Sequence, residues 1–486
     1  MKKKHIIIGS LLVIGAIMVG SSLAWWTWST SSNEQTNVVV TVGGITIDYE
    51  DGENITNNNL IPTSTKEKGI SKNITVSSTG QVYLNLNMAI VTLDDGLKDA
   101  SFKYEVYNGS DLVTGGNFAN SNVGDNIALL SGVEVTSSPT TYTLYIWIDG
   151  NMSNPNTMYN QNFEFRLNAE ATDEVPPITG VELTEQIASE VNEGTPSFGS
   201  VSTTDEGIYS APDDYGTSYY FRGAVENNYV KFADKYWRII RINGDGTIRL
   251  IYDGTSAHAN GESSTDRQIG TSAFNIRYSD NAYVGYMYGS TGASSYSAAH
   301  ANTNSSTIKT TVDNWYKTNI VDAGYSDKVA DVIYCNDRQI DNLSGYGTAL
   351  GYGKNQTAYM ARYRLYTNKS PVLTCTNKND RFTVSDTSRG NGALTYPVGL
   401  ITADEVAMGG GVYETSNSSY YLYTGNYYWT MSPSHFSGSS TLEFLGGNYL
   451  VSNRVTYTGG VRPVLSLKSD VQLSGSGTMS DPWTVN

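Results

Sequence analysis

The sequence predicts a multi-domain protein, with an all-β antiparallel sandwich over residues 36–171 and an α+β domain with many short strands over residues 207–486. Three observations support this prediction. The first part has a hydrophobic pattern of period two, residues 173–177 form a break that contains paired prolines, and the second part mixes helix and hairpin signals. The 486 residues are enough for two or three domains of about 150 residues each.

Residues 1–30 are expected to direct export. Lys2, Lys3 and Lys4 precede an uncharged, mostly apolar run over residues 6–26, and small residues before Trp25 offer a cleavage site between Ala24 and Trp25. The run is also long enough, at about 20 residues, to span a bilayer. The segment is therefore a signal peptide or an uncleaved membrane anchor, and the protein is expected outside the cell or on its surface.

Alternating apolar and polar residues predict half-buried strands in residues 36–171. The clearest examples lie at residues 82–90, 143–148 and 163–168. Turn signals such as Asn108-Gly109 and Asp149-Gly150 separate the strands, which favours an antiparallel sandwich.

Residues 172–206 are predicted to be a linker with a short helix. Pro176 and Pro177 cannot continue a sheet ladder. Thr179 and Glu182 have the spacing of a capping box, and apolar residues recur every four positions after them.

The second domain is predicted to combine strands with at least two helices. Residues 236–252 contain two apolar runs around Asn243-Gly244-Asp245-Gly246, which indicates a hairpin. Apolar residues at helical spacing over 308–320 predict one helix. Thr402 and Glu405 cap another, which Gly409-Gly410-Gly411 ends.

Composition and charge exclude some partners. The formal net charge is −16, and Lys and Arg form no cluster outside the first few residues, so nucleic acid is not an expected partner. Cys335 and Cys375 are the only cysteines, and in an exported chain they most simply form one disulfide. The four histidines have no metal-ligand spacing, and no cofactor is expected.

The first part resembles the camelysin and biofilm-fibre family of Gram-positive bacteria over roughly residues 1–171. The resemblance rests on Ser22-Leu23-Ala24-Trp25-Trp26-Thr27, Leu60-Ile61-Pro62, Ile74-Thr75-Val76 with Thr79-Gly80, and Tyr142-Thr143-Leu144-Tyr145-Ile146-Trp147. It implies export, residence at the surface or in the matrix, and self-association by strand exchange. The metalloprotease activity attached to that family is not carried over, because the sequence has no His-Glu-x-x-His.

The second part is similar to an uncharacterised domain of Gram-positive surface proteins over most of residues 200–486. The matching stretches are residues 207–209 and 213–223, residues 237–246, Tyr428-Trp429-Thr430-Met431-Ser432-Pro433, and Gly460-Val461-Arg462-Pro463-Val464-Leu465. The order of helix, Trp-x-x-Ser-Pro strand and terminal Gly-Val-Arg-Pro strand also resembles the C-type-lectin-like and formylglycine-generating folds. Met431 stands where the wider family commonly has arginine, so no role of that arginine is carried over.

Trp237, Tyr428, Trp429 and Arg462 are candidate binding residues, because aromatic rings and a guanidinium suit sugar rings or peptide ends. The alternative is that the tryptophans are core residues of strands. Arg462 beside Pro463 must be either paired or exposed.

The loop carboxylates Asp205, Glu206, Asp213 and Asp214 are weak calcium candidates, with solvated loop acids as the alternative. Catalytic patterns are missing: the sequence has no Gly-x-Ser-x-Gly and no phosphate-binding glycine loop, and Ser432, Ser434 and His435 form no triad spacing.

These observations predict a non-enzymatic binding or adhesion module that contacts a glycan or protein ligand on a cell surface or in a biofilm matrix. The alternative is a structural subunit of an extracellular fibre, formed by self-association. The membrane is a partner only through an uncleaved N-terminal segment.

Overall fold

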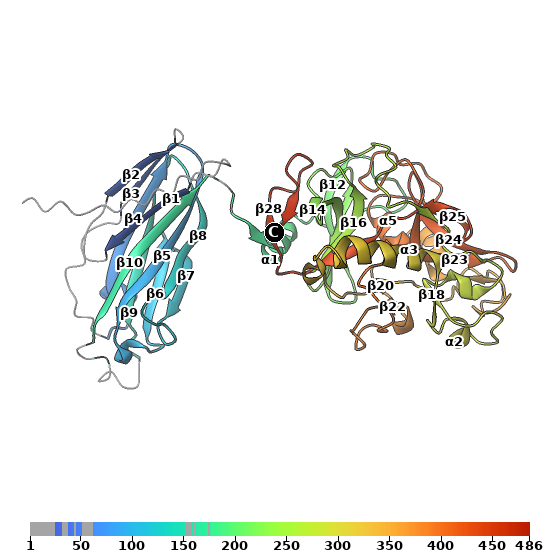
Figure 1. The fold of residues 1–486 in the computed structure, drawn as a ribbon, viewed down its shortest axis with the longest axis horizontal. Helices are drawn as coiled ribbons and strands as arrows, with labels where there is room; N and C mark the ends of the chain where they lie inside the picture. The colour runs from blue at the N-terminus through green and yellow to red at the C-terminus, as the bar shows by residue number, and fades with distance from the viewer. Residues whose placement is uncertain are drawn as a thin grey trace, which may run out of the picture. The chain divides into compact units, whose positions relative to one another are not determined.

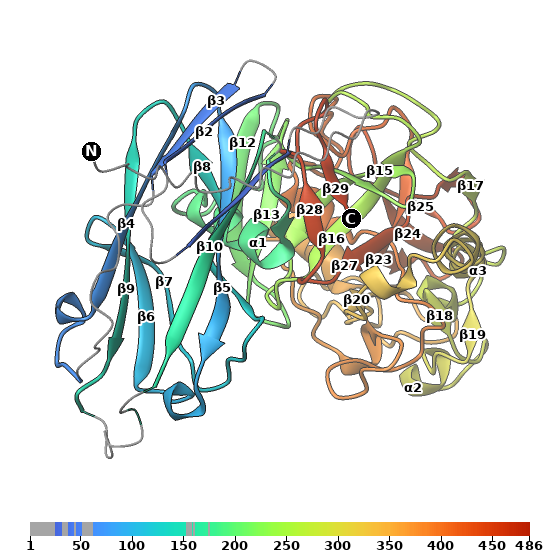
Figure 2. The same cartoon turned by 60° about the vertical axis from the view of Figure 1, so that its left-hand side comes forward.

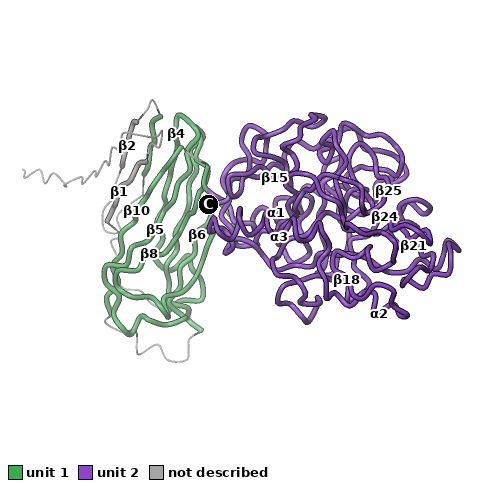
Figure 3. Tube along the Cα trace, turned by 45° about the vertical axis from the view of Figure 1, so that its right-hand side comes forward, with its two compact units in different colours: residues 1–176 green, residues 177–486 purple. Residues whose placement is uncertain are grey.

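The computed structural model describes residues 25–31, 37–42, 45–50, 62–151, 158, 161–173 and 175–486. The chain divides into two compact units, Met1–Pro176 and Pro177–Asn486 (Figure 3). Both units are built around antiparallel sheets, which confirms the predicted β-rich, multi-domain organisation.

Two antiparallel sheets build the first unit (Figure 1). The four-stranded sheet has the order β1 (Trp25–Ser31), β10 (Phe163–Thr172), β5 (Val82–Leu93) and β8 (Asn126–Val135). The six-stranded sheet has the order β2 (Asn37–Val42), β3 (Ile45–Glu50), β4 (Ile70–Ser78), β9 (Thr140–Ile148), β6 (Phe102–Asn108) and β7 (Asp111–Asn117).

The predicted alternation places one face of each sheet in a shared core. Strand β5 alternates buried and half-buried residues along most of its length, and its Met88 lies opposite Leu167 of β10. Leu144 and Ile146 of β9, in the other sheet, belong to the same hydrophobic cluster. Because successive side chains on a strand point to opposite faces, the period-two pattern forms this core directly.

The strands of the first unit start before the predicted boundary at residue 36. Strand β1 starts at Trp25 and pairs along its whole length with β10, which makes it an edge strand of the four-stranded sheet. Ala24 lies outside the described residues, so cleavage between Ala24 and Trp25 stays a prediction.

A nine-stranded sheet forms one part of the second unit. Its strands come from both ends of the unit's sequence, drawn in green and in red in Figure 2. The main path is β11 (Ile178–Thr179), β28 (Gln472–Ser474), β29 (Trp483–Val485), β14 (Tyr229–Phe232), β15 (Lys235–Ile242), β13 (Thr217–Gly223) and β12 (Asp205–Pro212). Strand β16 (Ile248–Gly254) pairs with β15 in the predicted hairpin and also with β27 (Val464–Leu467).

A six-stranded sheet forms another part. It contains β17 (Thr271–Ser272), β26 (Gly459–Gly460), β23 (Tyr428–Phe436), β24 (Thr441–Gly446) and β25 (Val451–Arg454), with β21 (Thr357–Ala358) paired to β23. Two short pairs complete the sheets: β18 (Met287–Tyr288) with β19 (Asn304–Ser305), and β20 (Tyr334–Cys335) with β22 (Arg381–Phe382).

The predicted helices are present. The helices are α1 (Gly180–Ser189), α2 (Tyr296–Ala299), α3 (Thr307–Tyr316), α4 (Met360–Arg362) and α5 (Ala403–Met408). In α5 the Thr402 side chain accepts from the Glu405 amide at 3.0 Å, and the Glu405 carboxylate accepts from the Thr402 amide at 2.9 Å. This is the capping box expected from the sequence.

Residues 177–206 belong to the second unit rather than to a linker. Strand β11 pairs with β28, and α1 buries Leu183 and Ile187 in the hydrophobic core of this unit. The capping box of Thr179 and Glu182 is formed as predicted. The prolines end the strand pattern, but the apolar face of α1 needs cover and finds it in the core.

The predicted disulfide joins Cys335 to Cys375, with 5.7 Å between the Cα atoms. Cys375 is fully buried. The bridge ties β20 to the loop that precedes β22, and its closed loop of 40 residues restricts the unfolded chain.

One buried carboxyl group lacks partners. Glu443 on β24 is 0% exposed, and neither of its carboxyl oxygens has a hydrogen-bond partner among the described residues. Burial raises the pKa of Glu443 well above its usual value, and the charge of Arg338 opposes this only in part. The folded state therefore holds Glu443 in its neutral, protonated form.

Substituting Glu443→Gln should stabilise the protein at neutral pH. Below the unfolded pKa of Glu443, about 4.3, the carboxyl group is protonated in both the folded and the unfolded state, and its burial does not reduce the free energy of unfolding. Because folding raises this pKa, the free energy of unfolding falls as the pH rises above that value. Glutamine stays neutral throughout, so the variant should gain melting temperature over the parent from about pH 5 to pH 8 and match it near pH 4. Calorimetry across this range measures the difference, and a pH-independent difference would contradict the assignment.

Candidate functional site

The four binding residues expected from the sequence lie in the interior. Trp237 on β15, Tyr428 and Trp429 on β23, and Arg462 before β27 are each 0% exposed. The Trp237 indole donates to the Phe232 carbonyl at 3.0 Å, and the Trp429 indole donates to the Ser272 carbonyl at 2.8 Å. No face of these side chains reaches solvent. They are therefore core residues, which was the alternative interpretation, and they cannot contact a ligand directly in this structure.

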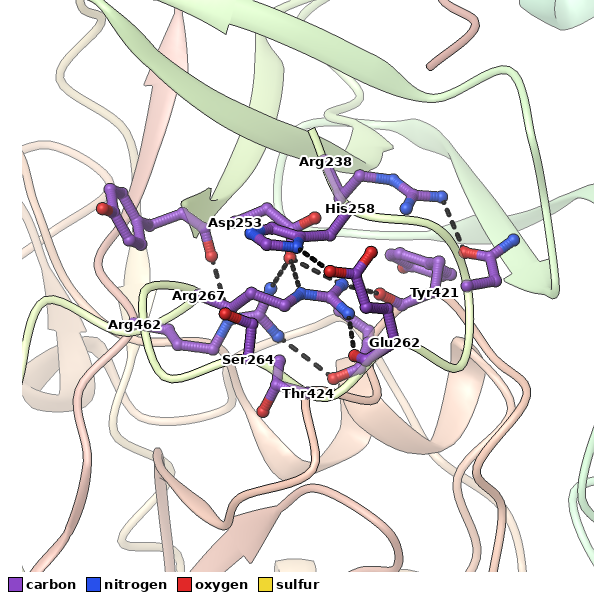
Figure 4. Close-up of polar contacts among 12 residues, drawn as sticks. Arg238, Asp253, His258, Glu262, Ser264, Arg267, Tyr421, Thr424 and Arg462 are labelled. Carbon is purple, nitrogen blue, oxygen red and sulfur yellow. Dashed lines mark hydrogen bonds and ion pairs between the residues drawn. The ribbon is translucent and has the colours of Figure 1, made fainter. Parts of the chain in front are cut away.

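Arg462 is paired inside the protein (Figure 4). Its guanidinium donates to the Tyr252 carbonyl at 2.9 Å, the Leu422 carbonyl at 3.1 Å and the Asp253 carboxylate at 2.7 Å. The same carboxylate oxygen of Asp253 accepts from Arg267 at 2.9 Å. One buried carboxylate thus joins two buried arginines and connects β16 to the segments before β17 and β27.

A third arginine lies beside this pair. Arg238 donates to the Asn228 side chain at 2.6 Å, and its guanidinium lies 3.7 Å from the centre of the Tyr229 ring. Burial lowers the pKa of Arg238 and of Arg462, because removal from water disfavours a charged group. The Tyr229 ring offsets part of this cost through its negative face. We call Arg238, Asp253, Arg267 and Arg462 the arginine cluster.

His258 lies next to the arginine cluster and is held on both sides. Its Nδ1 lies 2.8 Å from Glu262 and its Nε2 lies 2.8 Å from Asp266. The hydrogen bond with His258 lowers the pKa of Glu262. Burial alone would raise the pKa of Asp266, but hydrogen bonds from Ser264 and His258 hold it well below its usual range. Both ring nitrogens of His258 are occupied, so the imidazole fixes the loop rather than acting as a base.

The calcium candidates bind other groups of the chain. The shortest contacts pair Asp205 with the Gly207 amide, Glu206 with Arg222, Asp213 with Arg241, and Asp214 with the Cys375 amide and with Arg381. Their oxygens do not converge on a common point. Among the described residues, no three or more His, Cys, Asp or Glu side chains are arranged to hold a metal ion.

Asp213 and Asp214 border a small cavity near the disulfide. The cavity measures about 20 Å³ and is also lined by Arg241, Arg364 and Cys335. This volume holds about one water molecule. The cavity is too small for an organic substrate, and ion pairs occupy the charged groups around it.

Ser434 and His435 are adjacent but form no catalytic site. The Ser434 hydroxyl lies 3.0 Å from Nδ1 of His435, and Ser434 is 1% exposed. Burial, together with the charge of Arg362, lowers the pKa of His435 to about 4. A triad needs a carboxylate that orients the histidine, whereas the charged group that acts on His435 here is a cation.

An open depression on the second unit was not predicted from the sequence. It measures about 360 Å³ and is lined by Tyr278, Ser279, Lys354, Gly438, Ser439, Ser440 and Arg454. We call the surface formed by these seven residues the open depression. Two cations and no carboxylate line it, and the Arg454 guanidinium lies 5.8 Å from the centre of the Tyr278 ring.

Hydrogen bonds from the buried side chains of Thr441 and Asn281 hold the loops around the open depression. The Thr441 hydroxyl interacts with the carbonyls of Tyr278 and Asp280 at 2.8 and 2.9 Å. These contacts tie the loop that contains Tyr278 to β24. The side chain of buried Asn281 donates to the Gly353 and Asn355 carbonyls on both sides of Lys354, at 3.1 and 2.7 Å. Ser437 and Ser440 close the turn between β23 and β24. The backbone of the site is therefore fixed before any ligand arrives.

The open depression is assembled from four separated segments, at residues 278–279, 354, 438–440 and 454. Its residues have no common spacing that a sequence pattern could reveal. The one local signal is the glycine-rich stretch around Lys354, where Gly351 and Gly353 have positive φ angles of 67° and 54°.

Comparisons with protein-family models, curated proteins and solved structures found no match to this chain. Within the part of the chain that the structure describes, no helix has the length and apolar character needed to cross a bilayer.

Substituting Asp253→Asn should unfold the second unit more easily. The change leaves Arg267 and Arg462 buried without their shared countercharge, so we expect a loss of about 3–5 kcal/mol in the free energy of unfolding. Urea unfolding of the full chain measures this loss, with the unfolding monitored by hydrogen exchange in peptides from residues 177–486. Asp322→Asn is the control, because its pair with Lys317 is half exposed on both sides and solvent screens the attraction between the two charges. Equal losses in the two variants would contradict the role of Asp253.

Proposed function

We propose that this chain is an exported bacterial protein of the cell surface or matrix, and that its second unit is a non-enzymatic binding module. Export rests on the charged start and apolar run of residues 1–30. The resemblance of the second part to surface domains with a C-type-lectin-like order of elements supports the binding role. Fold resemblance alone does not assign a ligand.

The open depression is the observation that carries the proposal. It combines exposed cationic, hydroxyl and aromatic groups, and the hydrogen bonds of Thr441 and Asn281 fix the loops that present them. A preformed concave surface with a few polar groups is typical of ligand sites. A fixed backbone also lowers the entropy cost of binding.

Filling the open depression should abolish ligand binding without harming the fold. The full chain is screened on arrays of glycans, mucins and matrix proteins. Ser439→Trp should then weaken any specific signal about tenfold or more, because an indole ring occupies the space of the ligand. Ser439 is exposed on a turn, so the variant should fold.

Ser480→Trp is the matched control, since Ser480 is exposed in a different loop outside the open depression. It should bind like the parent. A ligand that Ser439→Trp binds with the affinity of the parent would remove the open depression as the site.

The second candidate function is a structural subunit of a fibre, and one observation favours it. Strand β7 ends the six-stranded sheet, and its Leu112 and Val113 are 57% and 42% exposed. The free edge of such a strand offers unpaired backbone groups to a neighbouring chain. Apolar exposed side chains on the same strand would be covered by that pairing.

Charges on this edge should block assembly. Light scattering of the parent should show growth in mass with concentration, and Leu112→Lys/Val113→Lys should stay monomeric because lysine on an edge strand opposes pairing. Asn120→Lys/Val123→Lys adds two lysines in the following loop, outside the strand, and should assemble like the parent. A parent that is monomeric at all concentrations would remove the fibre function.

A further inference from the structure

We infer that the open depression binds anionic carbohydrate, meaning a sugar chain that carries carboxylate, sulfate or phosphate groups. This inference rests on the proposed function of the second unit as a binding module, and it names the ligand class. These ligands share a sugar ring that carries hydroxyl groups and a negatively charged substituent.

The charge of the site differs from that of the chain. The protein has a net charge of −16, yet Lys354 and Arg454 are both exposed in the lining of one depression that contains no carboxylate. Neither forms an ion pair with a described residue. Exposed Arg277 directly precedes Tyr278 and adds a third cation to the same loop. These unpaired cations are available for charge-assisted hydrogen bonds to an anion.

Most other arginines of this unit are unavailable. Eight of the thirteen arginines in residues 177–486 are buried and serve the interior: Arg222, Arg238, Arg241, Arg249, Arg267, Arg338, Arg364 and Arg462. Exposed, unpaired arginine is therefore uncommon on this unit. Its presence at the open depression is a local feature that the fold does not require.

The remaining lining groups suit a sugar. The ring of Tyr278 is 41% exposed, and Ser279 and Ser439 are exposed hydroxyl residues beside it. A tyrosine ring packs against the apolar C–H face of a pyranose, and hydroxyl groups exchange hydrogen bonds with those of the sugar. The Arg454 guanidinium near the same ring places a cation next to the stacking surface.

A glycan fits these groups better than an acidic peptide. Protein interfaces depend on aromatic or aliphatic anchors that become fully buried in a pocket. The open depression offers Tyr278 alone as an apolar group, and its other lining residues are polar, charged or glycine. A ligand that brings charge and hydroxyl groups, rather than apolar side chains, matches this composition.

The test compares charge reversal inside the open depression with charge reversal outside it. The full chain, Lys354→Glu/Arg454→Glu and Lys231→Glu/Lys378→Glu are titrated against polygalacturonate, heparin and neutral dextran by biolayer interferometry. Both variants change the net charge equally, and Lys231 and Lys378 are exposed outside the open depression. A short acidic peptide, poly-glutamate, is the fourth probe. Polygalacturonate carries carboxylates alone, whereas heparin carries sulfates as well as carboxylates, so binding to heparin but not to polygalacturonate would assign the recognised charge to sulfate.

The expected result is binding of at least one anionic glycan, with no binding of dextran. The loss of one charge-assisted hydrogen bond weakens binding about tenfold, so Lys354→Glu/Arg454→Glu should weaken it about a hundredfold. Lys231→Glu/Lys378→Glu should change it less than about threefold, because screened surface charges contribute little.

Other results overturn the inference in distinguishable ways. Binding of a neutral glycan or of a protein on the arrays, unchanged by Lys354→Glu/Arg454→Glu, would refute the ligand class and leave the binding module intact. Tighter binding of poly-glutamate than of any glycan would assign the site to acidic peptides instead. An absence of binding to all probes and arrays would remove both the inference and the proposed function.

Discussion

Carboxylates shared between buried arginines are the constraint on which the second unit depends. Asp253 binds Arg267 and Arg462, and Glu405 binds Arg241 and Arg249, each pair on one carboxylate oxygen. Buried charges are tolerated only when they are paired and hydrogen-bonded, so each carboxylate fixes two cations at once. Removal of any single partner leaves a charge in the interior. The segments that carry these residues therefore depend on one another for their stability in the folded state.

Helix α5 shows how this constraint organises the core. Every residue of this helix is buried, although it carries two acids. Burial alone would raise the pKa of Glu405, but the charges of Arg249 and Arg241 lower it below its usual value. Arg364 binds the second acid, Asp404, and Arg222 donates to the carbonyl groups at the end of the helix. A helix this short has little stability of its own, and its ion pairs and packing hold it in place.

Local patterns in the sequence predicted the elements well, but the site poorly. The alternation of β5, the hairpin of β15 and β16, the capping boxes of α1 and α5 and the disulfide depend on neighbouring residues or on the only two cysteines. Trp237 and Arg462 were ambiguous, because an aromatic ring or a guanidinium has the same spacing in a core as in a cleft. The contacts of Trp237 with Phe232 and of Arg462 with Asp253 show that both side chains belong to the core. The open depression depends on four distant segments, so no local pattern contains it.

The burial of arginine also shapes how the surface meets a charged ligand. With eight arginines of the second unit buried, a chain of net charge −16 repels polyanions at a distance, whereas the exposed cations of the open depression attract them locally. At physiological ionic strength the Debye length is about 8 Å, so the distant repulsion is screened while direct contacts persist. A purely basic protein loses affinity for polyanions as salt rises, because attraction is its only electrostatic term. Here added salt weakens repulsion as well as attraction. The open depression therefore selects its ligand by contact geometry at Lys354 and Arg454 rather than by the overall field of the protein.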